Sequence, residues 1–483
     1  MDATNISPGK MVQLLLVGCA MVIVVVGGML LDQSVVDAQL IIVLGGGVVV
    51  LGLLFNGDRA RWALLCVAFA TLLFGHRGIY LGRWTFVVPL EVVGWLLFVV
   101  LLMNRVSNRA MVKVHIPAML GLLAVWIGLA AIAIVLDGGD MDAAAAWTLP
   151  IIFGVPAFVA VCGLVRHEAD VERLLTIIVI VTAAISALGL IEYVFPSEVT
   201  RLAPWFFVNK TLSTQDGFVR AVFGFWGYPA VGSIIAWGSY ISFQNIVTWN
   251  SRLKWANLIA LALTLIGIYI SGERAAWLSL GLGFILIAIS LRAYGWLAVG
   301  AMYFAVGFLP AEFWNRFQTI TNVVIRGESA DTSLLSRLDR WQWGIQTTLD
   351  YPLTGSGFGH WLVHNEILEI SSTVGIIPGI IFAIFVAALV IRIVKFALRA
   401  PTPRARQLGW LFTAIVVNWV VHISVEPDMH NPAFASPYWV LMAVAWYLPD
   451  MYSRLAQPVE KFKAYASQRL SAANDAAFDK SHA

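Results

Sequence analysis

Titratable side chains gather in the stretch HWLVHNEILEISSTVGIIPG, residues 360–379, just before an apolar run. The stretch holds His360, His364, Glu366 and Glu369. Because imidazole titrates near neutral pH, His364 is a candidate general base that takes a proton from a hydroxyl group. Glu366 and Glu369 are candidates for tuning its proton affinity, since a nearby carboxylate favours the charged imidazole. The alternative is an ordinary histidine at the membrane interface, hydrogen-bonded to a neighbour.

A metal site is the other chemistry that these histidines suggest. His360 and His364 have the i, i+4 spacing of a metal-binding helix face, but Trp361 stands where the zinc protease motif needs its glutamate. The preceding GSGFGH, residues 355–360, lacks the strand and the lysine of a phosphate-binding loop and is typical of a flexible turn. We therefore expect neither a metal ion nor another cofactor.

Four arginines, Arg220, Arg274, Arg337 and Arg340, lie in connections between apolar runs. The fixed fork of a guanidinium group donates two parallel hydrogen bonds to a phosphate and stays charged when partly desolvated. These arginines therefore predict a site for an anionic ligand. For each of them the alternative is contact with lipid headgroups, and for Arg274 it is also an ion pair with the adjacent Glu273.

Acidic residues suggest two further candidate functional positions. The segment EPDMHNP contains Glu426, Asp428 and His430, which are candidates for binding an acceptor, although a solvated loop is the simpler interpretation. Glu91, in VVPLEVVGWLL, is a charged residue inside an apolar run, where carboxylates are functional candidates by default.

The composition indicates a protein that crosses a membrane many times. Hydrophobic residues make up 60% of the 483 residues and charged residues only 12%, and the mean hydropathy is +0.82. Soluble domains have about 45 to 50% apolar and about 25% charged residues. The cysteines, Cys19, Cys66 and Cys162, lie in apolar runs without C-x-x-C spacing, which argues against a disulfide framework. The N-terminus lacks the pattern of a cleaved signal peptide, so we expect the first apolar run to be a span.

Apolar runs of about 20 residues predict an all-α fold, a polytopic transmembrane helix bundle with about 12 to 14 spans. The candidate helices lie near residues 11–31, 39–55, 62–74, 86–103, 116–136, 147–165, 174–194, 231–249, 255–270, 276–291, 295–309, 370–391, 408–423 and 437–448. The two runs on either side of SGERAAW, residues 271–277, are alternatively one bent helix.

Lysine and arginine in the connections set the orientation, because cytoplasmic loops carry the excess. They predict that both termini are cytoplasmic and that two long loops, residues 195–230 and 310–369, lie outside. In the second loop, Ser333 is a candidate N-cap and Pro352 a stop for an amphipathic helix on the outer leaflet or over a cavity. The predicted parts are N-terminal spans at 1–194, a core with both outer loops at 195–391, C-terminal spans at 392–451 and a cytoplasmic tail at 452–483.

Four segments resemble the bacterial O-antigen ligase and O-antigen polymerase family. RAVFGFWGYPAVGSIIAWGSY, residues 220–240, is similar to the family segment in which a glycine and then a proline follow an arginine. SGERAAWLSL, residues 271–280, resembles the S-x-S-R-x-x-W-L turn of the family. SRLDRWQWGIQTTLDYPLTGSGFG, residues 336–359, and HNEILEISSTVGIIPG, residues 364–379, resemble its R…P-L-x-G-x-G and H-N-x-x-L signature.

The chain departs from the family pattern at three places. One extra residue separates Arg220 from Gly224, and an alanine follows Pro229 where the family has asparagine. Glu273 stands before Arg274, where the pattern has serine.

The resemblance implies a membrane glycosyltransferase of the GT-C kind at the periplasmic face of the bacterial inner membrane. Such an enzyme transfers a glycan from undecaprenyl diphosphate to an acceptor sugar. The arginines and the histidine of the family carry over onto Arg220, Arg274, Arg337 and His364, and Arg337 is preferred to Arg340 because its distance to Pro352 fits the pattern. We expect His364 to be the general base, Arg274 and Arg337 to be catalytic, and the diphosphate to contact Arg220, Arg274, Arg337 and Arg340, in a transfer that inverts the anomeric carbon and needs no metal ion. The implied partners are the carrier-linked donor, a glycan or lipid-linked acceptor, membrane lipids and polysaccharide-assembly proteins, but not nucleic acid.

Three functions are compatible with these features. A polymerase of O-antigen or exopolysaccharide is favoured, because nothing in the sequence indicates a bulky lipopolysaccharide acceptor. The alternative within the family is a ligase that attaches glycan to the lipid A core. A transporter of an anionic lipid-linked substrate is the remote alternative, for which an internal repeat is expected and not found.

Overall fold

The computed structural model describes most of the chain from residue 118 to residue 454 and a few residues between 65 and 98. The gaps after residue 118 are 137–139, 203–211, 216–217, 222, 224–230, 249–253, 294, 296–331, 359–362, 427–428, 430 and 432–433. The predicted spans before residue 116, the span near 295–309 and the cytoplasmic tail therefore lie largely outside the described residues. So do Glu91, His360, Asp428 and His430.

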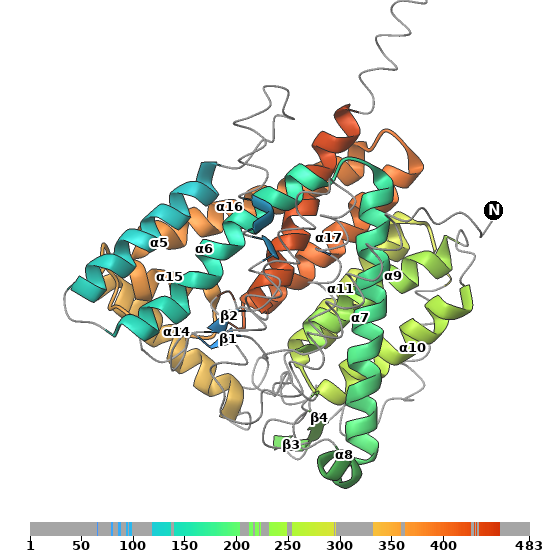
Figure 1. Ribbon diagram of the computed structural model, residues 1–483, viewed down its shortest axis with the longest axis horizontal. Helices are drawn as coiled ribbons and strands as arrows, with labels where there is room; N and C mark the ends of the chain where they lie inside the picture. The colour runs from blue at the N-terminus through green and yellow to red at the C-terminus, as the bar shows by residue number, and fades with distance from the viewer. Residues whose placement is uncertain are drawn as a thin grey trace, which may run out of the picture.

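Helices dominate the described part, which confirms the predicted all-α class (Figure 1). The first half contains α5 (Ala118–Leu136), α6 (Met141–Leu164), α7 (Glu168–Val194) and the short α8 (Pro196–Leu202). Two antiparallel hairpins accompany them, β1 (Ile79–Tyr80) with β2 (Phe86–Val87) and β3 (Leu212–Gln215) with β4 (Phe218–Ala221).

The second half continues with α9 (Gly232–Val247), α10 (Lys254–Ser271) and α11 (Arg274–Ser290). After these come α14 (Thr332–Asp350), α15 (Glu366–Val374), α16 (Ile376–Arg399), α17 (Pro403–Ile423) and a last helix over residues 434–454. The runs around SGERAAW are thus two helices rather than one bent helix, because the left-handed backbone of Gly272 (φ 62°) separates α10 from α11.

Four of the described helices are long and apolar enough to cross a membrane, namely α7, α10, α16 and residues Ala143–Leu164 of α6. Two shorter apolar segments, Ala118–Ala133 and Arg274–Ser290, accompany them. Their outward side chains include leucines and isoleucines that are more than half exposed, such as Leu129, Ile180 and Leu278. In a bilayer these side chains face acyl chains, so the protein is a membrane protein.

One predicted span has a different form. The sequence predicts a single helix near 370–391, but α15 ends at Val374 and α16 begins at Ile376. The break falls on Gly375, whose φ of 101° and ψ of 163° belong to a region that only glycine adopts readily. The carbonyl oxygen of Leu353 approaches this glycine so closely that an added Cβ would lie 2.4 Å from it.

Helix α17 occupies the middle of the described structure (Figure 1). It packs against α9 and α11 on one side and against α16 on the other, and α14 packs against α15. Buried polar side chains join these helices: Trp237 Nε1 donates to Asn418 Oδ1 at 3.0 Å, and Asn418 Nδ2 donates to Ser279 Oγ at 2.7 Å. Since unsatisfied polar groups are costly at membrane depth, these bonds fix the register of α9, α11 and α17.

Candidate active site

The turn that carries His364 lies against the amphipathic helix α14. That helix begins at Thr332, one residue before the expected N-cap Ser333, and ends two residues before Pro352 as predicted. Gly344 allows the close approach, since a Cβ at this position would lie 2.6 Å from Cγ1 of Val363. The indole nitrogen of Trp341 donates to the carbonyl oxygen of His364 at 2.9 Å.

The backbone at His364 is strained and held from several sides. Its φ is 57°, a left-handed conformation that is uncommon for residues other than glycine. The next residue, Asn365, caps α15 by accepting from Leu368 N at 3.1 Å, and its Nδ2 donates to the carbonyl oxygen of Ser424 at 3.2 Å. The imidazole therefore projects from a fixed turn rather than from the middle of a helix.

Glu366 and Glu369 support the loops around this turn. The carboxylate of Glu369 accepts a hydrogen bond from Val363 N at 2.6 Å. The carboxylate of Glu366 accepts one from Met429 N at 3.0 Å, and thus ties α15 to the loop after α17. Both side chains are buried. Their predicted tuning of the proton affinity of His364 stays a prediction.

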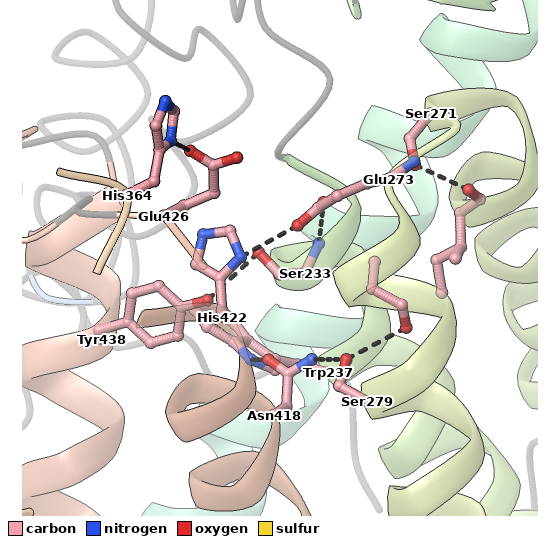
Figure 2. A network of polar contacts seen from close by, with 12 residues as sticks. Ser233, Trp237, Ser271, Glu273, Ser279, His364, Asn418, His422, Glu426 and Tyr438 are labelled. Carbon is pink, nitrogen blue, oxygen red and sulfur yellow. Dashed lines mark hydrogen bonds and ion pairs between the residues drawn. The ribbon is translucent and has the colours of Figure 1, made fainter. Parts of the chain in front are cut away.

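His364 belongs to a cluster of four side chains, with Glu426, Arg340 and Arg337. Its Nδ1 lies 2.9 Å from Oε2 of Glu426, and its Nε2 lies 2.6 Å from Nη1 of Arg340 (Figure 2 shows His364 and Glu426). Arg337 forms an ion pair with the other carboxylate oxygen of Glu426. The exposed fractions are 24% for Arg337, 18% for His364 and 11% for Glu426, so the cluster is largely shielded but still reached by solvent.

The hydrogen bonds assign the tautomer of His364. A guanidinium group has donors only, so the contact with Arg340 requires an unprotonated Nε2 that accepts. The proton is then on Nδ1 and is donated to the carboxylate of Glu426. This is the arrangement in which a carboxylate orients a general-base histidine and leaves Nε2 as the atom that takes a proton.

Glu426 keeps its negative charge in this setting. Burial alone would raise the pKa of its carboxyl group, but the hydrogen bond with His364 and the positive charge of Arg337 outweigh burial and hold the pKa below its usual range. Its position is set by the end of α17, because Glu426 N donates to the carbonyl oxygen of His422 at 2.9 Å.

The other two predicted arginines lie on separate elements. Arg274 is the first residue of α11 and is partly buried. Arg220 belongs to β4, where its backbone pairs with Ser213 opposite, and its side chain is also partly buried. The hydrogen bonds and ion pairs described above bring together Arg337, Arg340, His364 and Glu426. The roles of Arg220 and Arg274 as diphosphate ligands stay predictions.

Sequence reasoning missed one pair next to this cluster. His422 Nδ1 lies 3.0 Å from Oε1 of Glu273, and Oε2 of Glu273 accepts from Ser233 N at 3.0 Å (Figure 2). The sequence suggested Glu273 only as a partner of Arg274, and Glu426 only as an acceptor ligand. In the sequence, His422 and Glu426 stand four residues apart at the predicted outer end of an apolar run, and this spacing could have indicated that both have a role at the site.

Residues 259–384 match a family model described as O-antigen ligase. This region is similar to the O-antigen ligase family. The matched residues contain Arg274, Arg337, Arg340 and His364, whereas Arg220 and Glu426 lie outside the match. Comparison with curated protein sequences gave no significant match. The match supports a function of the O-antigen ligase or polymerase type, and members of that family are glycosyltransferase-like enzymes.

Proposed function

We propose that the protein transfers a glycan from undecaprenyl diphosphate to a sugar hydroxyl at the periplasmic face of the bacterial inner membrane. The observation that carries this proposal is the hydrogen-bonded series Glu426–His364–Arg340, with Arg337 on the far side of Glu426. It combines an oriented base with two neighbouring cations, which are the groups needed to deprotonate an alcohol and to bind a diphosphate.

In the proposed reaction, Nε2 of His364 takes the proton of the acceptor hydroxyl. The acceptor oxygen attacks the anomeric carbon, and the bond from that carbon to the diphosphate oxygen breaks. The electron pair leaves with undecaprenyl diphosphate, and attack from the opposite face inverts the anomeric centre. A well-placed general base is worth about 10² to 10⁴ in rate.

Arginine side chains would bind the leaving group. The charge on the departing diphosphate grows as the bond breaks, and fixed cations in a shielded site stabilise that charge more strongly than cations in water. Arg340 and Arg337 stand next to the base and would meet the diphosphate first, with Arg274 and Arg220 as further ligands. These charges would take the role that a divalent metal ion has in other transferases, so we expect chelators to leave the rate unchanged.

Arg340 has to change partner during this reaction. Its guanidinium group covers Nε2 of His364, so the base cannot take a proton from an alcohol until Arg340 moves. A diphosphate is a stronger partner for a guanidinium group than a neutral imidazole, because the hydrogen bonds are charge-assisted. Donor binding would therefore draw Arg340 onto the diphosphate and uncover the base.

We favour a polymerase of O-antigen or exopolysaccharide, in which the acceptor is itself a carrier-linked glycan. The test is transfer by purified protein in liposomes that contain an undecaprenyl-diphosphate-linked oligosaccharide. A ladder of longer carrier-linked products on a gel is the expected result. Products only after addition of a lipid A core acceptor would indicate a ligase, and movement of intact donor across the bilayer without a new glycosidic bond would indicate a transporter.

A histidine outside the site provides the matched control for this assay. His167, which precedes α7 at the end opposite the predicted outer face, is exposed. We expect His364→Gln to abolish product formation and His167→Gln to leave it unchanged. Full activity of the His364→Gln protein would contradict its role as base.

A further inference from the structure

The carboxylate of Glu273 lies where three helices meet, beside the candidate active site. Glu273 directly precedes α11, and its Oε2 accepts from Ser233 N in the first turn of α9. Its Oε1 lies 3.0 Å from Nδ1 of His422 in the last turn of α17. The free N–H groups and dipole at the start of a helix favour a negative charge there. One carboxylate thus holds the starts of α9 and α11 against the end of α17.

The surroundings leave this pair little freedom. The side chain of His422 is 1% exposed and that of Glu273 is 10% exposed. The imidazole of His422 stacks on the ring of Tyr438 with a centroid distance of 6.1 Å, and the hydroxyl of Tyr438 donates to Ser233 Oγ at 3.2 Å. Gly232 makes room for the carboxylate, because a Cβ there would lie 2.8 Å from Oε2 of Glu273.

Both members of the pair are attached to residues of the candidate site. Arg274 follows Glu273 directly in the chain. On the other side, the carbonyl oxygen of His422 accepts from Val425 N at 3.0 Å and from Glu426 N at 2.9 Å, so His422 anchors the turn that presents Glu426. In Figure 2 the pair of His364 and Glu426 lies next to that of His422 and Glu273.

We infer that Glu273 and His422 form a positioning pair, which sets the place of Glu426 relative to His364 by locking the end of α17 to the start of α11. In the contacts described above, neither side chain is hydrogen-bonded to His364 or to the carboxylate of Glu426. Their effect passes through the backbone of the turn after α17, and the charge of His422 also acts on Glu426. The inference rests on the proposed function, because it concerns the efficiency of the base at His364. A misplacement of about 1 Å at a reacting group can lower a rate about 100-fold.

The test compares Glu273→Gln and His422→Gln with the double variant in the liposome transfer assay. Glutamine at 273 keeps an acceptor for Ser233 N but removes the charge. We expect each single variant to lower kcat about 10- to 100-fold per folded protein, with a smaller change in the donor KM. Because the two residues act as one unit, we expect the loss of kcat in the double variant to equal the loss in the more impaired single variant.

Ser239→Ala is the matched control. It removes a buried hydrogen bond of 2.8 Å between Ser239 Oγ and Thr264 Oγ1, which joins α9 to α10 away from the pair. We expect its kcat to equal that of the wild type. Independent, multiplicative losses in the double variant, or single variants with full kcat, would overturn the inference.

Hydrogen exchange separates this inference from the proposed function. The amides of Val425 and Glu426 both donate to the carbonyl oxygen of His422. We expect them to exchange at least tenfold faster in Glu273→Gln than in the wild type or in Ser239→Ala. Unchanged exchange would overturn the positioning role. Faster exchange in a protein whose wild type transfers no glycan would instead refute the proposed function and leave the structural link intact.

Discussion

Nδ1 of His364 lies 2.9 Å from Oε2 of Glu426, although 62 residues separate the two in the chain. Helices α15, α16 and α17 lie between them in the chain. The hydrogen bond from Asn365 Nδ2 to the carbonyl oxygen of Ser424 holds the same two segments together. The contact defines a direction for the imidazole: Nδ1 faces the carboxylate and Nε2 faces the arginine side of the site.

Replacement of Glu426 by glutamine is expected to lower the transfer rate strongly. The amide nitrogen of glutamine would donate to Nδ1 and move the imidazole proton to Nε2, the atom that has to accept. Such an inverted tautomer costs about 10⁴ in a Ser-His-Asp triad, and we expect a loss of about 10² to 10⁴ here. Single-turnover rates of Glu426→Gln and Glu426→Asp provide the measurement. Aspartate keeps the acceptor, so equal losses in the two variants would contradict the orienting role.

The stability of the protein should respond to acid through Glu426. Its pKa is lower in the folded protein than in the unfolded chain, so its ion pairs stabilise the fold at pH values above the unfolded pKa, about 4.3 for glutamate. This stabilisation is lost as the pH falls through the lower folded pKa. We expect the difference in Tm between wild type and Glu426→Gln to be constant from about pH 7 to 5 and to shrink below about pH 4. Thermal unfolding in detergent at a series of pH values measures it, and a difference that grows on acidification would contradict this assignment.

The shielding of His364 by Arg340 can be measured without any substrate. Diethyl pyrocarbonate modifies the unprotonated nitrogen of imidazole, and Arg340 covers that atom at 2.6 Å. We expect Arg340→Ala to increase the modification rate of His364 several-fold, as followed by mass spectrometry. Modification of His167 in the same sample provides the internal control, and its rate should not change. Equal rates at His364 in both proteins would argue against the covering contact.

The break between α15 and α16 should tolerate only glycine. Alanine at position 375 would have to adopt a φ of about 101° and would place its Cβ 2.4 Å from the carbonyl oxygen of Leu353. We expect Gly375→Ala to destabilise the fold by about 1 to 3 kcal/mol. Gly128→Ala in α5 is the control, because nothing lies within 4 Å of the added Cβ. Thermal unfolding of both variants checks this, and a Tm of Gly375→Ala at or above that of the control would count against a strained break.

Much of this architecture could be predicted from the sequence. Apolar runs of helical length located the described helices from α5 to α17 except the short α8, α14 and the division between α15 and α16. The serine-to-proline interval before residue 352 located α14. The predicted outer position of the arginines and the resemblance to the O-antigen ligase and polymerase family singled out Arg337, Arg340 and His364, which the structure joins in one cluster. For the helices, local patterns sufficed because a helix depends on residues close in the chain.

Three features depend on tertiary contacts and were not predictable. The division of the span near 370–391 follows from the close approach of Leu353 to Gly375. The partnership of Glu426 with His364 follows from the packing of α14 and α15 near the end of α17. The pair of Glu273 and His422 joins elements that only the folded bundle brings together. In the sequence, the i, i+4 spacing of His422 and Glu426 marks these two residues, but nothing in it identifies His364 and Glu273 as their partners.

The central claim is that His364 is the base of a transfer from a diphosphate carrier, and one measurement tests it most directly. Single-turnover formation of the glycosidic bond is followed with saturating undecaprenyl-diphosphate-linked donor and EDTA, for wild type and His364→Gln, with donor binding measured in parallel. We expect full activity of the wild type in EDTA, and for the variant unchanged binding with a rate lower by about 10² to 10⁴. A variant that binds donor and turns over at the wild-type rate would contradict the claim.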